Sequence, residues 1–166
     1  MPGPSRQALI GAGANLGDRR ATLEAALEKL RAQPGVNSVT RSAFYETEPV
    51  GLKEQPAFLN LAAGVETTLT PEALMTALLG IEQEFGRVRM VRWGPRTLDL
   101  DLLAFEGETR AGEFLTLPHP RMLGRDFVTV PLRELLAREP FKTKWPELRT
   151  AIGAGGGEQG VRRLES

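Results

Sequence analysis

The fold of this chain is decided by the stretch Trp93-Gly94-Pro95-Arg96-Thr97-Leu98-Asp99-Leu100-Asp101-Leu102-Leu103-Ala104. From Leu98 to Leu102 apolar and acidic residues alternate, with Asp99 and Asp101 as the acidic members. A period of two predicts a β-strand with leucines on one face and both carboxylates on the other. Two carboxylates at that spacing repel each other, and a cation between them relieves the repulsion. The stretch therefore predicts a strand that is buried on one face and carries a candidate cation site on the other.

Four arginines precede the acidic pair in the same region of the chain: Arg87, Arg89, Arg92 and Arg96. Magnesium held by carboxylates can bridge phosphate oxygens, while guanidinium groups neutralise the remaining phosphate charge. A solvated loop and strand face would explain the same residues without a ligand, but their adjacency favours a polyphosphate site. Trp93, in the same loop, either stacks on a planar ligand or folds back onto the surface.

The composition predicts one globular domain over residues 1–150 and a glycine-rich, mobile tail over residues 151–166. The 21 basic and 21 acidic residues cancel, which argues against general nucleic-acid binding. Because there is no cysteine, disulfides and thiolate metal sites are excluded. The start of the chain lacks an apolar leader, and no apolar run approaches the ~20 residues of a membrane span. These features predict a cytoplasmic protein without a membrane partner.

Hydrophobic periodicity and turn residues predict the order β-α-β-β-α-β. Asp18 and Thr70 are the expected N-caps of the two helices, and Pro71 takes the first helical position of the second. Strands are expected over residues 7–12, 36–45, 58–68, 98–105 and 114–117, helices over 19–32 and 71–85, a loop over 46–56, and helical turns or a short helix within 121–136. This order predicts an α+β sandwich in which an antiparallel sheet carries its helices on one face. The other face would then be free to hold a site.

Other motifs are less informative. The glycines of residues 11–17 follow a GxGxxxG spacing and no βαβ unit follows them, so a tight turn is favoured over a dinucleotide site. The chain has no GxxxxGK[ST] phosphate loop, and no Ser/His/Asp or Cys/His set can be assembled. His119, the only histidine, lies between two prolines. It is either a donor to a phosphate or an ordinary turn residue.

Six segments together resemble one known family: residues 10–18, 45–51, 55–60, 86–89, 92–101 and 117–122. Over roughly Leu9 to Leu136 the chain is similar to the 6-hydroxymethyl-7,8-dihydropterin pyrophosphokinase family, with Arg-Trp-Gly-Pro-Arg-Thr-Leu-Asp-Leu-Asp as the most specific block. The resemblance implies a ferredoxin-like α+β fold. It also implies transfer of the β,γ-pyrophosphate of ATP to the hydroxymethyl oxygen of the pterin, with release of AMP, in folate biosynthesis.

The resemblance further implies a role for particular residues. Asp99 and Asp101 would bind two Mg²⁺, and Arg87 and Arg96 would lie nearest the chemistry. The four loop arginines would grip the triphosphate, together with nucleotide contacts from Glu82, Leu102, Thr116, His119 and Arg125. The pterin would lie between the rings of Phe58 and Phe127, with Thr47, Val50, Asn60 and Asp99 around it and Trp93 covering the closed site. Such an enzyme is expected to be a monomer with small-molecule substrates.

Two alternatives stay open on the residues alone. Another Mg²⁺-dependent nucleotidyl or phosphoryl transferase on the same kind of sheet would share the aspartates and arginines but use a different acceptor. AMP as the product would distinguish the pyrophosphokinase from it. A ferredoxin-like RNA-binding or regulatory module would need aromatic and basic residues on its surface strands, and the neutral charge and the acidic pair argue against it.

Overall fold

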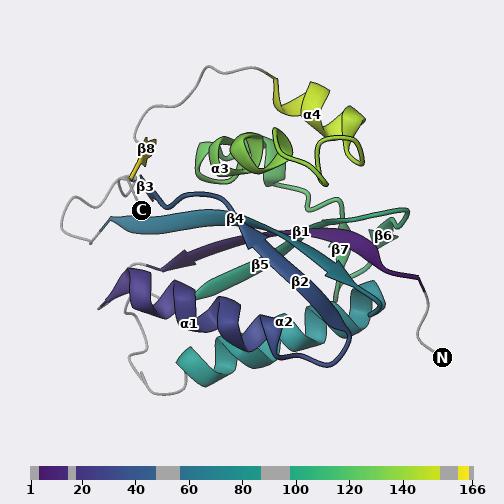
Figure 1. The fold of residues 1–166 in the computed structure, drawn as a ribbon, viewed down its shortest axis with the longest axis horizontal. Coiled ribbons are helices and arrows are strands. Elements are labelled where there is room, and N and C mark those ends of the chain that lie inside the picture. The colour runs from purple at the N-terminus through teal and green to yellow at the C-terminus, as the bar shows by residue number, and fades with distance from the viewer. Residues whose placement is uncertain (1–3, 15–17, 48–56, 87–97, 154–160, 165–166) are drawn as a thin grey trace.

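The computed structural model describes residues 4–14, 18–47, 57–86, 98–153 and 161–164 (Figure 1). Within them a six-stranded sheet has the order β5-β1-β4-β3-β8, and β2 also pairs with β4. Its strands are β1 (Arg6–Ala14), β2 (Val36–Arg41), β3 (Tyr45–Thr47), β4 (Phe58–Thr67), β5 (Asp99–Phe105) and β8 (Val161–Arg163). All of their pairings are antiparallel. A separate hairpin joins β6 (Arg110–Ala111) and β7 (Thr116–Leu117).

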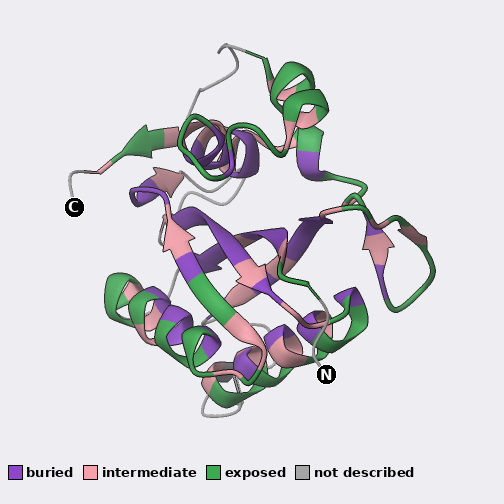
Figure 2. Ribbon diagram, turned by 45° about the vertical axis from the view of Figure 1, so that its right-hand side comes forward, coloured by how far each residue is buried: buried purple, intermediate pink, exposed green. Residues whose placement is uncertain are grey.

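One face of the sheet packs on α1 (Arg19–Arg31) and α2 (Pro71–Gly86), which lie below it in Figure 1. Both predicted caps are confirmed. Asp18 Oδ1 accepts from the Ala21 N–H at 3.1 Å, and Thr70 Oγ1 accepts from the Ala73 N–H at 3.1 Å. The core between the layers includes Ile10, Leu27, Leu61, Leu74, Leu78, Ile81, Leu98, Leu100 and Leu102, all nearly inaccessible to solvent. Figure 2 shows this burial on the sheet and on the inner sides of the helices.

The opposite face of the sheet is also covered, which corrects the prediction that helices occupy one face only. The short 3₁₀ turn η1 (Met122–Gly124) is followed along the chain by α3 (Asp126–Leu136) and α4 (Pro146–Ile152). Both helices lie above the sheet in Figure 1. A second apolar cluster joins Leu9, Ala62 and Leu103 of the sheet to residues of α3 such as Leu132. Phe141 is also in this cluster, and a Cβ at Gly64 would lie 2.2 Å from its ring, so glycine permits this close approach.

The predicted strand over residues 36–45 is two strands in the structure, because the chain shifts at Ser42. Its N–H donates to the Ala62 carbonyl at 2.8 Å, and its hydroxyl accepts from the Ala62 N–H at 3.0 Å. The hydroxyl thus replaces a backbone acceptor of the ladder. Pairing then resumes at β3, whose last two residues belong to the region predicted as loop.

Elements near the C-terminus also differ from expectation. Residues 161–163 of the predicted mobile tail form β8, which pairs with β3. Residues 154–160 lie outside the described part of the chain. No described helix is both long enough and apolar enough to cross a membrane.

Candidate active site

One row of residues crosses the sheet on the face that α3 covers. Register pairs Asp99 of β5 with Gly13 of β1, Gly13 with Asn60 of β4, and Asn60 with Tyr45 of β3. Directly paired residues project from the same face of a sheet. A Cβ at Gly13 would lie 2.6 Å from the Asn60 Oδ1, which confirms that the Asn60 side chain lies over this glycine.

The acidic pair lies on this face, as the alternation predicted. Asp99 and Asp101 are half-buried, whereas Leu100 between them is 3% exposed and belongs to the opposite core. Asp101 pairs with Gly11, just as Asp99 pairs with Gly13. Neither glycine has a side chain, so the Asn60 amide lies directly against Gly13 and the Leu103 side chain lies against Gly11.

The carboxylate oxygens suit Mg²⁺, a hard cation that takes oxygen ligands and retains several waters. Among the described residues no group of three His, Cys, Asp or Glu side chains converges on one point. A magnesium ion held by Asp99 and Asp101 would thus need further ligands from elsewhere. Substrate phosphates and water supply such ligands in many nucleotide enzymes.

Glu82 of α2 holds the edge of β5 next to the acidic pair. Its carboxylate accepts from the Leu100 N–H at 2.7 Å. This backbone group lies between the two aspartates on the outer strand of the sheet. Glu82 therefore positions the strand, in addition to its predicted contact with the nucleotide.

The residues predicted to bind the pterin occur at the β3–β4 end of the row. Asn60 Nδ2 donates to Thr47 Oγ1 at 2.7 Å, and Thr47 pairs with Phe58. Phe127 lies in the first turn of α3, over the same face of the sheet, with the Arg125 guanidinium 5.5 Å from its ring centroid. The structure thus brings Thr47, Phe58 and Asn60 together.

The residues predicted on the nucleotide side follow β5 along the chain. The His119 N–H donates to the Leu103 carbonyl at 2.8 Å, and Nδ1 accepts from the Arg121 N–H at 3.2 Å. With Nδ1 as an acceptor, the neutral ring carries its proton on Nε2, which can donate to a phosphate. The Thr116 hydroxyl donates to the Gly112 carbonyl at 3.0 Å. Leu102 is buried in the core against α1 and α2, so its side chain is not accessible to a nucleotide.

Six predicted residues lie outside the described part of the chain: Val50, Arg87, Arg89, Arg92, Trp93 and Arg96. Their roles stay predictions.

A polar network beside the row was missed at the sequence level. The Glu134 carboxylate of α3 accepts from the Tyr45 hydroxyl at 2.5 Å, from the Ala43 N–H at 3.0 Å, from Arg163 Nε at 3.3 Å, and from Arg138. Burial and the contact with Glu134 raise the pKa of Tyr45 to about 12. Burial alone would raise the pKa of Glu134, but the hydrogen bonds from Tyr45 and Ala43 lower it below its usual value. The spacing of Glu134 and Arg138 was the one local signal for this network.

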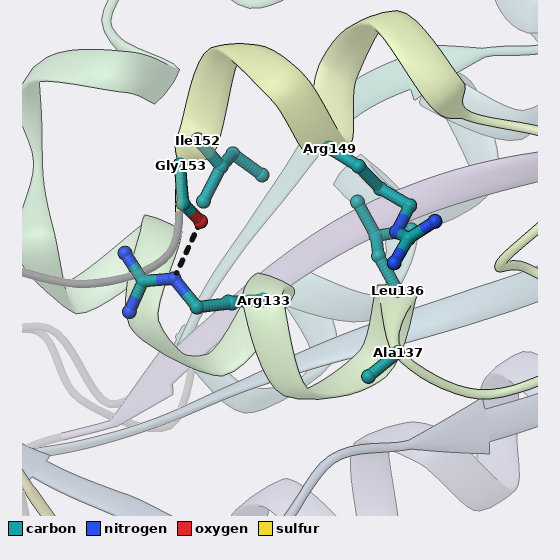
Figure 3. Close-up of a pocket in the computed structure, with 6 residues that line it drawn as sticks. All are labelled: Arg133, Leu136, Ala137, Arg149, Ile152 and Gly153. Atoms are coloured by element: carbon teal, nitrogen blue, oxygen red, sulfur yellow. Dashed lines mark hydrogen bonds between the residues drawn. The ribbon is translucent and has the colours of Figure 1, made fainter.

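A cavity of about 320 Å³ lies elsewhere, between α3 and α4. Its lining is Arg133, Leu136, Ala137, Arg149, Ile152 and Gly153, none of which is a predicted site residue (Figure 3). Arg133 Nε donates across it to the Gly153 carbonyl at 3.1 Å. The predicted site residues of the described chain therefore lie on the sheet row and its neighbours, away from this cavity.

A carboxylate pair beside glycines on an antiparallel sheet is typical of α+β enzymes that transfer phosphoryl groups with the help of Mg²⁺. A solved structure described as HPPK-DHPS in complex with substrates superimposes with a TM-score of 0.63. It covers 90% of this chain at 14% sequence identity, and this chain spans 43% of that one. At that identity the likeness concerns the fold alone, and it confirms the ferredoxin-like prediction.

A family model described as 7,8-dihydro-6-hydroxymethylpterin-pyrophosphokinase (HPPK) matches residues 9–137. The chain belongs to this family, as its motifs predicted. A relative from Methylorubrum extorquens is 48% identical over 129 residues, which are 78% of this chain and 82% of the relative. One from Bacillus subtilis is 46% identical over 128 residues, 77% of each chain. Both are named 2-amino-4-hydroxy-6-hydroxymethyldihydropteridine pyrophosphokinase.

Proposed function

We propose that this chain transfers the β,γ-pyrophosphate of ATP to the hydroxymethyl group of 6-hydroxymethyl-7,8-dihydropterin, a step of folate biosynthesis. Family membership supports the reaction. The observation that supports the location of the proposed site is the row from Asp99 to Asn60. This row places a carboxylate that suits a metal–phosphate complex and an amide that suits a heterocycle on one face of the sheet. In the transfer, the hydroxymethyl oxygen bonds to the β-phosphorus. The α,β-bridging oxygen leaves with AMP, and the attacking oxygen loses its proton.

Asp99 and Asp101 are the proposed ligands of two Mg²⁺ ions. Bound magnesium supplies charge neutralisation and polarises the phosphoryl group. Glu82 accepts a hydrogen bond from the backbone N–H between the two aspartates, and this contact fixes the position of their part of β5. His119 donates from Nε2 to a phosphate oxygen, and Arg125 and the four loop arginines add positive charge. Pyrophosphoryl transfer needs this positioning and charge balance more than covalent help from the protein.

The Asn60 amide is proposed to form hydrogen bonds with the polar edge of the pterin. Its amide nitrogen is already engaged by Thr47, so the orientation of the amide is set before substrate arrives. Preorganisation of this kind lowers the entropy lost on binding. Phe58 and Phe127 are the proposed stacking rings, and Val50 and Trp93 complete the pocket.

The test is incubation of the purified protein with Mg²⁺-ATP and 6-hydroxymethyl-7,8-dihydropterin, followed by chromatography of the nucleotides. We expect AMP and pterin diphosphate in equal amounts, and loss of both on addition of EDTA. ADP or free pyrophosphate as the product would instead support the transferase with a different acceptor. Tight, Mg²⁺-independent RNA binding would support the regulatory module.

Three further proposals come from the sequence: a monomer, a cytoplasmic location, and one catalytic domain over residues 1–150, to which β8 at residues 161–163 adds a strand. Size-exclusion chromatography with light scattering tests whether the protein is a monomer. Cell fractionation of a strain that expresses the tagged protein tests its location. Limited proteolysis tests the third, since one domain should resist cleavage as a unit.

A further inference from the structure

The C-terminal strand β8 covers the edge of the sheet next to the proposed pterin pocket. It pairs Arg163 with Tyr45, Arg162 with Glu46 and Val161 with Thr47. The Leu164 N–H continues the contact by donating to the Phe44 carbonyl at 2.8 Å. Without β8, the three-residue strand β3 would be the edge of this part of the sheet. Short strands at an edge are the least ordered part of a sheet because half of their backbone groups have no ladder partner.

Two arginines of β8 anchor it on opposite faces of the sheet. Arg162 contacts Glu46 at 2.6 Å, and the same carboxylate contacts Arg19 of α1 at 3.0 Å. Hydrogen bonds from Arg19 and Arg162 lower the pKa of Glu46, which is therefore charged at neutral pH. Arg163 contacts Glu134 of α3 at 3.3 Å. Strand β8 is thus tied through Glu46 to the helix below the sheet and through Glu134 to the helix above it.

The strand that β8 holds carries a residue of the proposed pocket. Thr47 is the last residue of β3 and accepts the hydrogen bond that orients Asn60. Tyr45, two residues earlier, is paired on one side with Asn60 and on the other with Arg163. The row that begins at Asp99 on the opposite edge of the sheet therefore extends to Arg163.

We propose that Arg162 and Arg163 are positioning residues for the pterin: they hold β8 on β3 and so keep Thr47 and Asn60 in the arrangement that binds the heterocycle. The inference rests on the proposed function. Since β4 and β1 separate β3 from the aspartates of β5, the effect is confined to the pterin and leaves ATP binding unchanged. Both arginines are exposed and their carboxylate partners are partly exposed. Ion pairs of this kind contribute little to global stability, so their loss should free β3 locally without unfolding the protein.

The test compares full-length R162E/R163E with the matched charge reversal K142E/R149E, whose positions are exposed and lie outside this network. R162K/R163K is the conservative variant. Steady-state KM values for pterin and for Mg²⁺-ATP, kcat, and hydrogen exchange of residues 43–47 are measured for each. If glutamates facing Glu46 and Glu134 reduce the paired population of β3 to about one tenth, the apparent affinity for pterin falls about tenfold.

We expect R162E/R163E to raise the pterin KM about tenfold and to speed exchange in residues 43–47, with kcat and the ATP KM within about twofold of the original chain. R162K/R163K should restore the pterin KM, and K142E/R149E should leave it unchanged. An unchanged pterin KM, an equal rise in both KM values, or the same rise in K142E/R149E would overturn the proposal.

Two further measurements keep the result interpretable. If R162E/R163E does not fold, the milder pair R162A/R163A is judged by the same criteria. If the unaltered chain forms no AMP with the pterin, the proposed function fails. Faster exchange of β3 in the variant would still show that β8 holds this strand, so the two failures are distinguishable.

Discussion

The two faces of the sheet are made by the same strands but have different compositions. The face over α1 and α2 is apolar along the described length of the strands, with Ala8, Ile10 and Ala12 of β1, Leu61, Ala63 and Val65 of β4, and Leu100 and Leu102 of β5. The face beneath α3 is apolar only where Leu9, Ala62 and Leu103 meet the helix. Farther along the strands it carries Gly13, Asn60 and Asp99.

We expect this difference to separate stability from function within single strands. Successive side chains of a strand point to opposite faces, so neighbouring residues belong to different environments. Substitution of one residue should then change the free energy of unfolding, and substitution of the next should change turnover. The predictions below test this separation, beginning with the largest expected effect.

Asp99→Asn and Asp101→Asn should each lower turnover about a thousandfold or more, because in the proposed site each carboxylate holds the metal–phosphate complex. The free energy of unfolding should change by less than about 0.5 kcal/mol, since both side chains lie outside the apolar cores. Single-turnover AMP formation and urea titration measure the two quantities. Glu113→Gln, on an exposed turn, is the matched control. Near-normal turnover in either aspartate variant would remove the metal role from this face.

Leu100→Ala tests the opposite face at the position between the two aspartates. Leu100 is 3% exposed in the core against α1 and α2, so its truncation should cost about 3 kcal/mol of the free energy of unfolding. Below the unfolding transition, turnover should fall far less than in Asp99→Asn. Equal losses of turnover in the two variants would contradict the separation of the faces.

Tyr45 tests the polar network under α3. It is the only tyrosine of the chain, so the ultraviolet absorbance of tyrosinate reports this residue alone. Its pKa should be about 12 in the folded protein and near the ordinary value of 10.0 in urea. Because the folded-state pKa is the higher one, the stabilisation is complete below pH 10 and is lost as pH rises to about 12. Glu134→Gln should move the folded-state pKa back toward 10.0, and titration of the folded chain at the ordinary value would show that this network does not form.

Gly13→Ala and Gly11→Ala test the two glycines that pair with the aspartates. A Cβ at Gly13 would lie 2.6 Å from Asn60 Oδ1, whereas one at Gly11 would meet Leu103 at an ordinary 3.5 Å. Gly13→Ala should displace the Asn60 amide from Thr47 and raise the pterin KM about fivefold, since about 1 kcal/mol is the usual net contribution of one hydrogen bond. Gly11→Ala should leave the pterin KM within about twofold. Equal KM values in the two variants would show that the Asn60 orientation does not matter for binding.

Local patterns predicted much of the fold. The caps at Asp18 and Thr70 and the strand over residues 98–105 depend on contacts between residues close in the chain, and the structure confirms them. The sequence did not predict that helices cover the second face of the sheet. The periodicity of α3 shows that one side of the helix is buried, but it does not show which surface that side contacts. β8 was missed since a three-residue strand has no periodicity of its own.

The sequence by itself determined that Asp99 and Asp101 share a face, because two residues separated by one position in a strand must do so. It also determined the family, through motifs that are contiguous in the chain. Only the tertiary structure decided that Gly13, Asn60, Tyr45 and Arg163 continue the row that starts at Asp99. That row depends on strand order and register, which are set by pairing between segments far apart in sequence and by the packing of whole faces.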